Sequence, residues 1–136
     1  MDFEDLRVGQ TASLGKTVSE ADILMFAAVS LDTNPVHLNE EAAKASIFGT
    51  RIAHGMLSAG LISAVLGTQL PGPGTLYMSQ QLRFRAPVKI GDTVTATVEV
   101  TALNAEKKRA TLTTICTVGD EVVIEGEAYV QVPSRG

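Results

Sequence analysis

The segment Asp32-Thr33-Asn34-Pro35-Val36-His37 places a carboxylate, an amide and an imidazole within six residues. Proline restricts the residue before it to an extended conformation, so we expect a fixed loop here rather than a helical turn. A carboxylate and an imidazole on one rigid loop can hold the same water molecule, and the Asn34 amide can orient it. Because histidine titrates near neutral pH, this combination favours general acid–base chemistry on the bound water.

The same residue types are ordinary turn formers, which leaves a structural interpretation open. In that interpretation Asp32 and Asn34 hydrogen-bond within the turn, while His37 packs or caps. Other chemistries are disfavoured. One histidine with one aspartate offers too few ligands for a metal site, so we expect no metal. The chain contains no G-x-S-x-G nucleophile elbow and neither common glycine-rich phosphate-binding pattern.

The second histidine opens the tripeptide His54-Gly55-Met56, at the start of a predicted helix from Gly55 to Leu66. Backbone N–H groups at a helix N-terminus lack partners within the helix and carry partial positive charge. A substrate carbonyl oxygen could therefore be stabilised at Gly55 as it becomes an oxyanion. In the alternative interpretation Gly55 only permits a tight turn. We expect His54 to orient that turn rather than to catalyse.

The elements that must position these residues divide into a helical first half and a second half of strands. A helix is predicted over Thr17–Ser30, with Ser19 and Asp22 forming a capping box, and a short one from the Asn39 cap through Ala45. The Gly55–Leu66 helix is apolar nearly all round, which predicts burial on every side.

After the loop at residues 71–74, apolar and polar residues alternate over residues 81–86, 93–100, 110–118 and 122–132. This pattern predicts half-buried antiparallel strands, with a hairpin at residues 119–120. Pro87 and Gly126 are expected to mark an edge or a bulge. A curved antiparallel sheet around one buried helix is the simplest α+β architecture in this order. Its edge strand would pair with a second subunit.

Length and charge exclude several classes of protein. With 136 residues the chain fits one domain, residues 1–136. The net charge of −4 and the lack of a basic run argue against nucleic-acid and membrane partners. The single cysteine, Cys116, excludes an internal disulfide, and we expect it to fill space rather than react. The acidic N-terminus shows no secretory signal, so we expect a cytoplasmic protein.

Taken together, these motifs resemble the MaoC-like hot-dog family, and within it the (R)-specific enoyl-CoA hydratases linked to polyhydroxyalkanoate synthesis. The resemblance rests on the D-x-N-P-x-H segment together with H-G-M, and covers nearly the whole chain. Other matching segments are Phe48-Gly49, Leu70-Pro71-Gly72, Leu82-Arg83-Phe84, Pro87-Val88, Gly91-Asp92 and Gly126-Glu127-Ala128.

The resemblance implies a hot-dog fold, a homodimer, and reversible syn addition of water to trans-2-enoyl-CoA to give (R)-3-hydroxyacyl-CoA. By the same resemblance Asp32 and His37 would activate the water, Asn34 would help hold it, and the Gly55 N–H would bind the thioester oxygen. Ser63 would lie near the dyad. By approximate match, the acyl pocket would involve Gly60, Leu66 and Val130. No metal or redox cofactor is implied, and CoA enters only as part of the substrate.

We hypothesise that Asp32 acts mainly as the base and His37 as the proton relay, although the pair can titrate as a unit. Two positions depart from the family pattern. Leu31 stands where the family usually has glycine, and Thr50-Arg51 differs from the usual residues before H-G. Both departures bear on substrate size more than on activity. Basic residues that could meet the CoA phosphates, or simply be solvated, are Arg83, Arg85, Lys89, Lys107 and Lys108.

Three other functions stay open. A related dehydratase could act on acyl-carrier-protein substrates in fatty acid synthesis, and the sequence does not separate CoA from carrier protein. A thioesterase on the same fold is disfavoured, because the D-x-N-P-x-H loop is typical of hydratases. A non-catalytic acyl-CoA-binding hot-dog domain would not need the three water-holding groups Asp32, Asn34 and His37.

Overall fold

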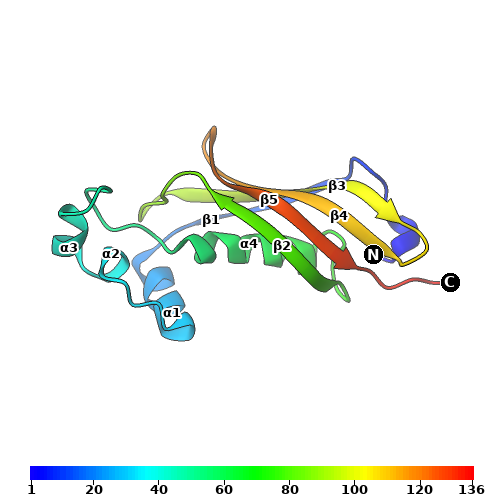
Figure 1. Cartoon of the computed structure of the whole chain (residues 1–136), viewed down its shortest axis with the longest axis horizontal. Coiled ribbons are helices and arrows are strands. Elements are labelled where there is room, and N and C mark those ends of the chain that lie inside the picture. The colour runs from blue at the N-terminus through cyan, green and yellow to red at the C-terminus, as the bar shows by residue number, and fades with distance from the viewer.

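The computed structural model describes residues 1–136 and consists of one antiparallel sheet, one long helix and several short helices (Figure 1). The five strands follow the sheet order β1-β3-β4-β5-β2. Their bounds are β1 Thr11–Thr17, β2 Leu76–Phe84, β3 Thr93–Asn104, β4 Arg109–Val118 and β5 Glu121–Gln131. The helices are η1 Phe3–Asp5, α1 Glu20–Ser30, α2 Pro35–Leu38, α3 Glu40–Lys44 and α4 Gly55–Thr68.

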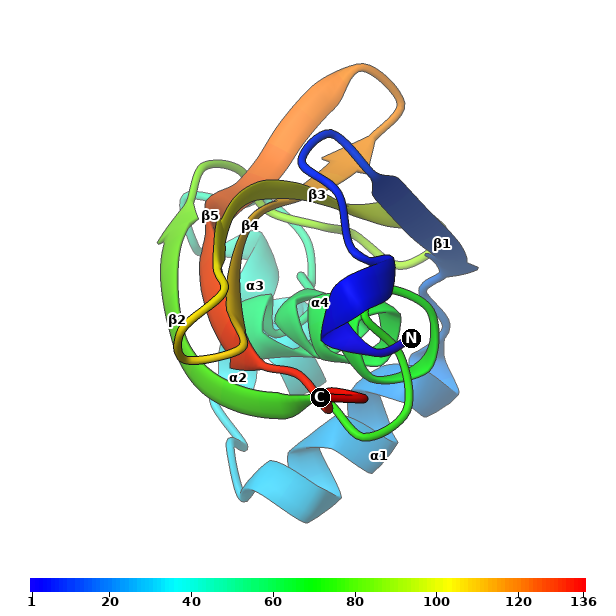
Figure 2. The same cartoon turned by 90° about the vertical axis from the view of Figure 1, so that its right-hand side faces the viewer.

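The sheet curves around α4, as Figure 2 shows, and the predicted arrangement of one helix wrapped by antiparallel strands is confirmed. Alternating residues of β3, namely Val94, Ala96, Val98 and Val100, are fully buried against the helix side. Ile62, Val65 and Leu66 of α4 belong to the same core. In Figure 1 helices α1–α3 lie beyond one end of the sheet, while both termini lie at the other end.

The first strand was not predicted, and the predicted start of the first helix at Thr17 is wrong. Thr17 ends β1, where its hydroxyl meets the Thr93 hydroxyl at 2.7 Å across the β1–β3 pair. The capping box itself is confirmed, since Ser19 and Asp22 exchange side-chain bonds with each other's backbone N–H. Strand β1 is short, polar and mostly exposed, so it lacks the apolar alternation from which strands are recognised.

The predicted fixed loop before His37 is partly wrong, because Pro35–Leu38 forms one turn of helix. Proline fits the first helical position, where its missing N–H has no partner to lose. Asn34 lies just before this turn at φ −52° and ψ 126°, outside the helical region, as expected for a residue that precedes proline. The cap by Asn39 on the following helix is confirmed.

Helix α4 is not buried on every side, which corrects the prediction made from its composition. Leu57, Ile62 and Val65 face the sheet, but Met56 is 55% exposed. Gly60 and Ser63 are also exposed on that outer side. An apolar helix can thus leave one side uncovered in a single chain, which exposes a surface suited to a partner.

Gly126 marks neither an edge nor a bulge. It lies within β5, which pairs on both sides with β2 and β4. A Cβ at Gly126 would collide with the Gln81 carbonyl of β2, so glycine permits a close approach of two backbones here. Pro87 lies outside the strands, in the connection that follows the edge strand β2.

None of the helices has the length and apolar character needed to cross a membrane.

Cys116 lies on β4, fully buried, with its Sγ 3.6 Å from the Ser58 carbonyl of α4. Burial raises the pKa of the thiol to about 11. The thiolate is the reactive form, and it is scarce at neutral pH.

We therefore predict that Cys116 does not react with a disulfide reagent such as DTNB at pH 8 in the folded protein, and reacts fully in urea. Because the folded pKa is raised, the stabilisation that comes from keeping the thiol protonated is complete below pH 9. It is lost as the pH rises from 9 toward 11. Colorimetric thiol counts at pH 8, with and without urea, check this, and rapid labelling of the folded chain would contradict it.

Candidate active site

Helix α1 is capped by Leu31, whose backbone adopts the left-handed conformation with φ 65° and ψ 12°. Glycine adopts this conformation without strain, whereas a residue with a Cβ pays of order 1 kcal/mol. The Leu31 side chain is 82% exposed, so the Cβ is accommodated by pointing away from the protein. The departure from the family's glycine therefore leaves the turn that delivers Asp32 in place.

The polar side chains of the following loop do form turn hydrogen bonds. Asp32 Oδ1 accepts from the Asn34 N–H at 3.2 Å, and Asn34 Oδ1 accepts from the Val36 N–H at 3.2 Å. Each acceptor group keeps further lone pairs, because a carboxylate can accept several hydrogen bonds. The structural and the chemical interpretations of this loop are thus compatible, since the turn bonds fix side chains that still face solvent.

His37 is held by its surroundings so that one ring nitrogen stays free. Its Nδ1–H donates to the Ile52 carbonyl at 2.8 Å, and the side chain is buried. In the neutral ring Nε2 is then an acceptor. Arg51 secures the backbone, because its Nε donates to the His37 carbonyl at 2.7 Å and its guanidinium bonds Glu20 of α1 at 2.7 Å.

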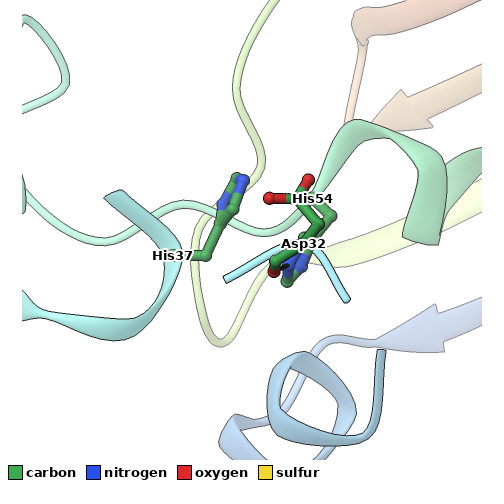
Figure 3. A group of neighbouring side chains, drawn as sticks. All are labelled: Asp32, His37 and His54. Atoms are coloured by element: carbon green, nitrogen blue, oxygen red, sulfur yellow. Dashed lines mark hydrogen bonds between the residues drawn. The ribbon is translucent and has the colours of Figure 1, made fainter. Parts of the chain in front are cut away.

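His54, directly before α4, connects the N-terminus of that helix to the loop that contains Asp32. Its Nε2–H donates to the backbone carbonyl of Asp32 at 2.9 Å. The His54 ring stacks on the His37 ring, with 3.9 Å between the ring centroids and 27° between the ring planes. On α1, the centroid of the Phe26 ring lies 4.8 Å from that of His54. Figure 3 shows the side chains of Asp32, His37 and His54 gathered together, the first two from the segment that follows α1 and the third from the residue before α4.

Asp32, His37 and His54 each offer one ligand-type atom within 4.8 Å of the others, so the prediction that a third metal ligand is lacking is wrong. The orientation of the two histidine rings nevertheless argues against metal binding. Lone pairs of imidazole lie in the plane of the ring, and two nearly parallel stacked rings do not direct them to one point. A zinc ion needs its nitrogen ligands to converge at about 2.0–2.1 Å. The arrangement fits acid–base chemistry better than metal binding.

Gly55 begins α4 beside a cavity of about 320 Å³. The cavity walls include Ile52, Ala53, Val88 and Ile124, and their apolar side chains limit its hydration. A Cβ at Gly55 would lie 2.6 Å from the Phe84 ring, so Phe84 packs where any other residue would extend. Glycine permits this close contact.

The remaining predicted site residues do not all come together. Ser63 and Gly60 line a separate groove with Phe26, Met56 and residues of β2. Leu66 and Val130 lie in the hydrophobic core and line none of the cavities. A second small hollow joins Asp32, His54 and Gly55, so the structure brings the aspartate beside the helix N-terminus.

Sequence reasoning missed three contributors, namely Phe84, Arg51 and Ser58. Phe84 and Arg51 act through tertiary contacts, which a pattern of neighbouring residues in the sequence does not predict. Ser58 carried a usable signal, because it follows His54 by four residues, and residues four apart lie on the same face of a helix.

Comparison with known proteins assigns the family. A model described as a MaoC like domain matches residues 6–124. The chain belongs to the MaoC-like family.

Two MaoC-like relatives are similar over nearly the whole chain. The "(R)-specific enoyl-CoA hydratase" of Rhodospirillum rubrum is 66% identical and covers 98% of this chain and 93% of its own length. The "3-hydroxybutyryl-CoA dehydratase" of Methylorubrum extorquens is 58% identical, with 98% and 85% covered. Among solved structures, the "(R)-hydratase from A. caviae involved in PHA biosynthesis" superposes with a TM-score of 0.92 at 49% identity, with 96% and 99% covered. The predicted hot-dog fold is confirmed.

We predict that Gly55→Ala lowers the free energy of unfolding by about 1–3 kcal/mol, because the new methyl group overlaps the Phe84 ring. Gly67→Ala is the matched control, since Gly67 lies on the same helix with open space around it, and alanine is the better helix former. Phe84→Leu should recover part of the loss in the double variant. Urea unfolding of wild type, the two single variants, the double variant and the Gly67→Ala control measures this, and additive effects of the Gly55 and Phe84 changes would contradict it.

Proposed function

We propose that this MaoC-like protein is an (R)-specific enoyl-CoA hydratase, a hydro-lyase that adds water reversibly to trans-2-enoyl-CoA. The observation that carries the proposal is the meeting of Asp32, His37 and the N-terminus of α4 within one small region. The relatives supply the chemical direction, because two with 66% and 49% identity are named as (R)-specific enoyl-CoA hydratases.

The proposed role of Gly55 follows from its place at the first position of α4. Hydration of an enoyl thioester builds negative charge on the thioester oxygen as water attacks C3. A helix N-terminus presents N–H groups and partial positive charge to that oxygen, and the interaction strengthens where water is excluded. Gly55 lines both the cavity and the hollow that contains Asp32, so an oxygen bound there would lie beside the first turn of α4.

The proposed acid–base pair is Asp32 with His37. A water molecule held by both can donate one hydrogen to the carboxylate and the other to His37 Nε2, which is an acceptor because Nδ1 is committed to Ile52. As the water oxygen bonds to C3, one O–H bond breaks and its proton passes to the pair. The pair returns a proton to C2, and the C2=C3 π bond is consumed. Both additions come from the side where the pair lies, which gives syn addition.

The reaction moves protons and changes no oxidation state overall, so we propose that it needs no redox cofactor. We propose that it needs no metal either, because the stacked histidine rings do not direct their lone pairs to one point. CoA would be present only as part of the substrate. The reverse reaction, dehydration of a 3-hydroxyacyl-CoA, uses the same groups with their roles exchanged. Asn34 would steady the loop through its cap on α2. A cytoplasmic location accords with this substrate.

We predict that the purified protein hydrates crotonyl-CoA, followed as loss of the conjugated enoyl absorbance, and that chiral analysis finds the (R)-3-hydroxy product. Asp32→Asn and His37→Gln should each slow turnover by roughly a hundredfold or more, as expected for a lost acid–base group. Gly67→Ala should leave the rate unchanged, and so should EDTA.

The assay also separates the competing functions. Turnover of enoyl-carrier protein without turnover of any enoyl-CoA would move the assignment to the carrier-protein dehydratase. Binding of enoyl-CoA with no hydration of either substrate class would leave a non-catalytic binding domain. A fully active Asp32→Asn variant would remove Asp32 from the mechanism.

We propose further that the protein is a homodimer. Strand β2 is an edge strand, and its residues Leu76, Tyr77, Met78 and Phe84 are 38–57% exposed. The neighbouring open side of α4 exposes Met56. Exposed apolar edges of this kind are usually covered by a second chain.

Light scattering after size exclusion should therefore give twice the mass of 14.3 kDa. Met78→Lys should shift the protein toward monomer, because it places a charge on the apolar edge, whereas Lys107→Met on the β3–β4 turn should not. A monomeric wild-type protein at micromolar concentration would contradict the proposal.

A further inference from the structure

Two buried side-chain polar atoms without hydrogen-bond partners belong to residues that line the same cavity. They are His54 Nδ1 and Ser58 Oγ, in side chains that are 2% and 1% exposed. Only two other buried polar atoms lack partners, on Arg51 and Arg109, and neither residue lines a cavity. A buried polar group left unsatisfied costs about 1–3 kcal/mol, so a coincidence at one cavity calls for an explanation.

The two atoms are complementary. The Nε2–H of His54 donates to the Asp32 carbonyl, so Nδ1 of the neutral ring is an acceptor. The Ser58 hydroxyl can donate and accept. The residues are four apart, which places them one turn apart on the same face of α4. Ser58 is held in place by its burial within α4, and its carbonyl also accepts a weak hydrogen bond from the Cys116 thiol of β4.

The cavity has the properties that a single bound water requires. Its volume is about 320 Å³, which exceeds the space needed for one water molecule. Most of its lining residues are hydrophobic, and the first turn of α4 supplies His54, Gly55 and Ser58. A buried water needs at least two polar partners, and these two unpartnered atoms supply them.

We propose that His54 Nδ1 and Ser58 Oγ bind one water molecule, and that this water keeps the proton on His54 Nε2 and thereby makes His54 a positioning residue for Asp32. The water donates to Nδ1 and shares a second hydrogen bond with the Ser58 hydroxyl. A proton on Nδ1 instead would remove the donor that holds the Asp32 carbonyl. Because the His54 ring stacks on the His37 ring, a fixed His54 also fixes the position of His37. The consequence for catalysis rests on the proposed hydratase function.

The kinetic test compares two variants of His54. Gln keeps an N–H donor near the position of Nε2, whereas Phe keeps the stacking ring and loses the donor. His54→Phe should lower kcat by roughly a hundredfold with crotonyl-CoA, since a misplacement of about 1 Å can cost that much, and should leave KM nearly unchanged. His54→Gln should recover most of kcat. Equal activity of His54→Phe and wild type, or equal losses in both variants, would overturn the positioning role.

The second test does not depend on turnover. Nitrogen-15 NMR of the histidine ring should show His54 protonated at Nε2, with Nδ1 accepting a hydrogen bond. Ser58→Ala should shift the Nδ1 signal toward that of a nitrogen without a donor, and should lower kcat about fivefold. A crystal structure should show an ordered water between the two atoms in wild type. Unchanged nitrogen signals in folded Ser58→Ala would overturn the proposal.

The two tests separate the inference from the function beneath it. If the protein hydrates no enoyl thioester but the NMR signals behave as stated, the water site stands and the hydratase function fails. If hydration is rapid but the signals are insensitive to Ser58, only the water site fails. Circular dichroism identifies a variant that does not fold. If His54→Phe does not fold, the NMR and kinetic results for Ser58→Ala test the proposal in its place.

Discussion

The hydrogen bond from His54 Nε2 to the Asp32 carbonyl is the link on which the arrangement of the site depends. Asp32 follows α1, and His54 directly precedes α4, so this bond joins the backbone at the reactive carboxylate to the residue that begins the helix. The bond at 2.9 Å fixes both at once. The matching bond from His37 Nδ1 to the Ile52 carbonyl fixes the other imidazole against the segment that leads into α4.

The curved sheet provides the rigid reference for these bonds. Ala53 donates its N–H to the Val88 carbonyl at 2.7 Å, and Ile52 bridges to Lys89, so the segment before α4 is anchored beside the connection that leaves β2. The core behind α4 is made of fully buried aliphatic residues of β3, β4 and β5. Close-packed interiors deform little, and such an interior keeps the helix N-terminus in place relative to the loop.

The sequence predicted the parts of this protein that have a local cause. Alternation in β3 and β4, the Ser19 cap and the apolar stretch of α4 are each visible in neighbouring residues. Strand β1 was missed because its pairing with β3 is its main support, and Gly126 was misread because its reason is a backbone on the next strand. The pairing of Asp32 and His37 was predictable from spacing, whereas the stack on His54 joins residues far apart in the chain.

Both histidines are held by backbone carbonyl groups, at Asp32 and Ile52, and not by side chains. A carbonyl is present whatever residue occupies the position. The two bonds that orient the rings therefore do not use the carboxylate itself, even though the reactive group resides on residue 32. A change of the Asp32 side chain removes the carboxylate and leaves both ring-to-carbonyl bonds with their acceptors. The geometry of the His54 ring and the reactivity of the carboxylate thus rest on different atoms of the same residue.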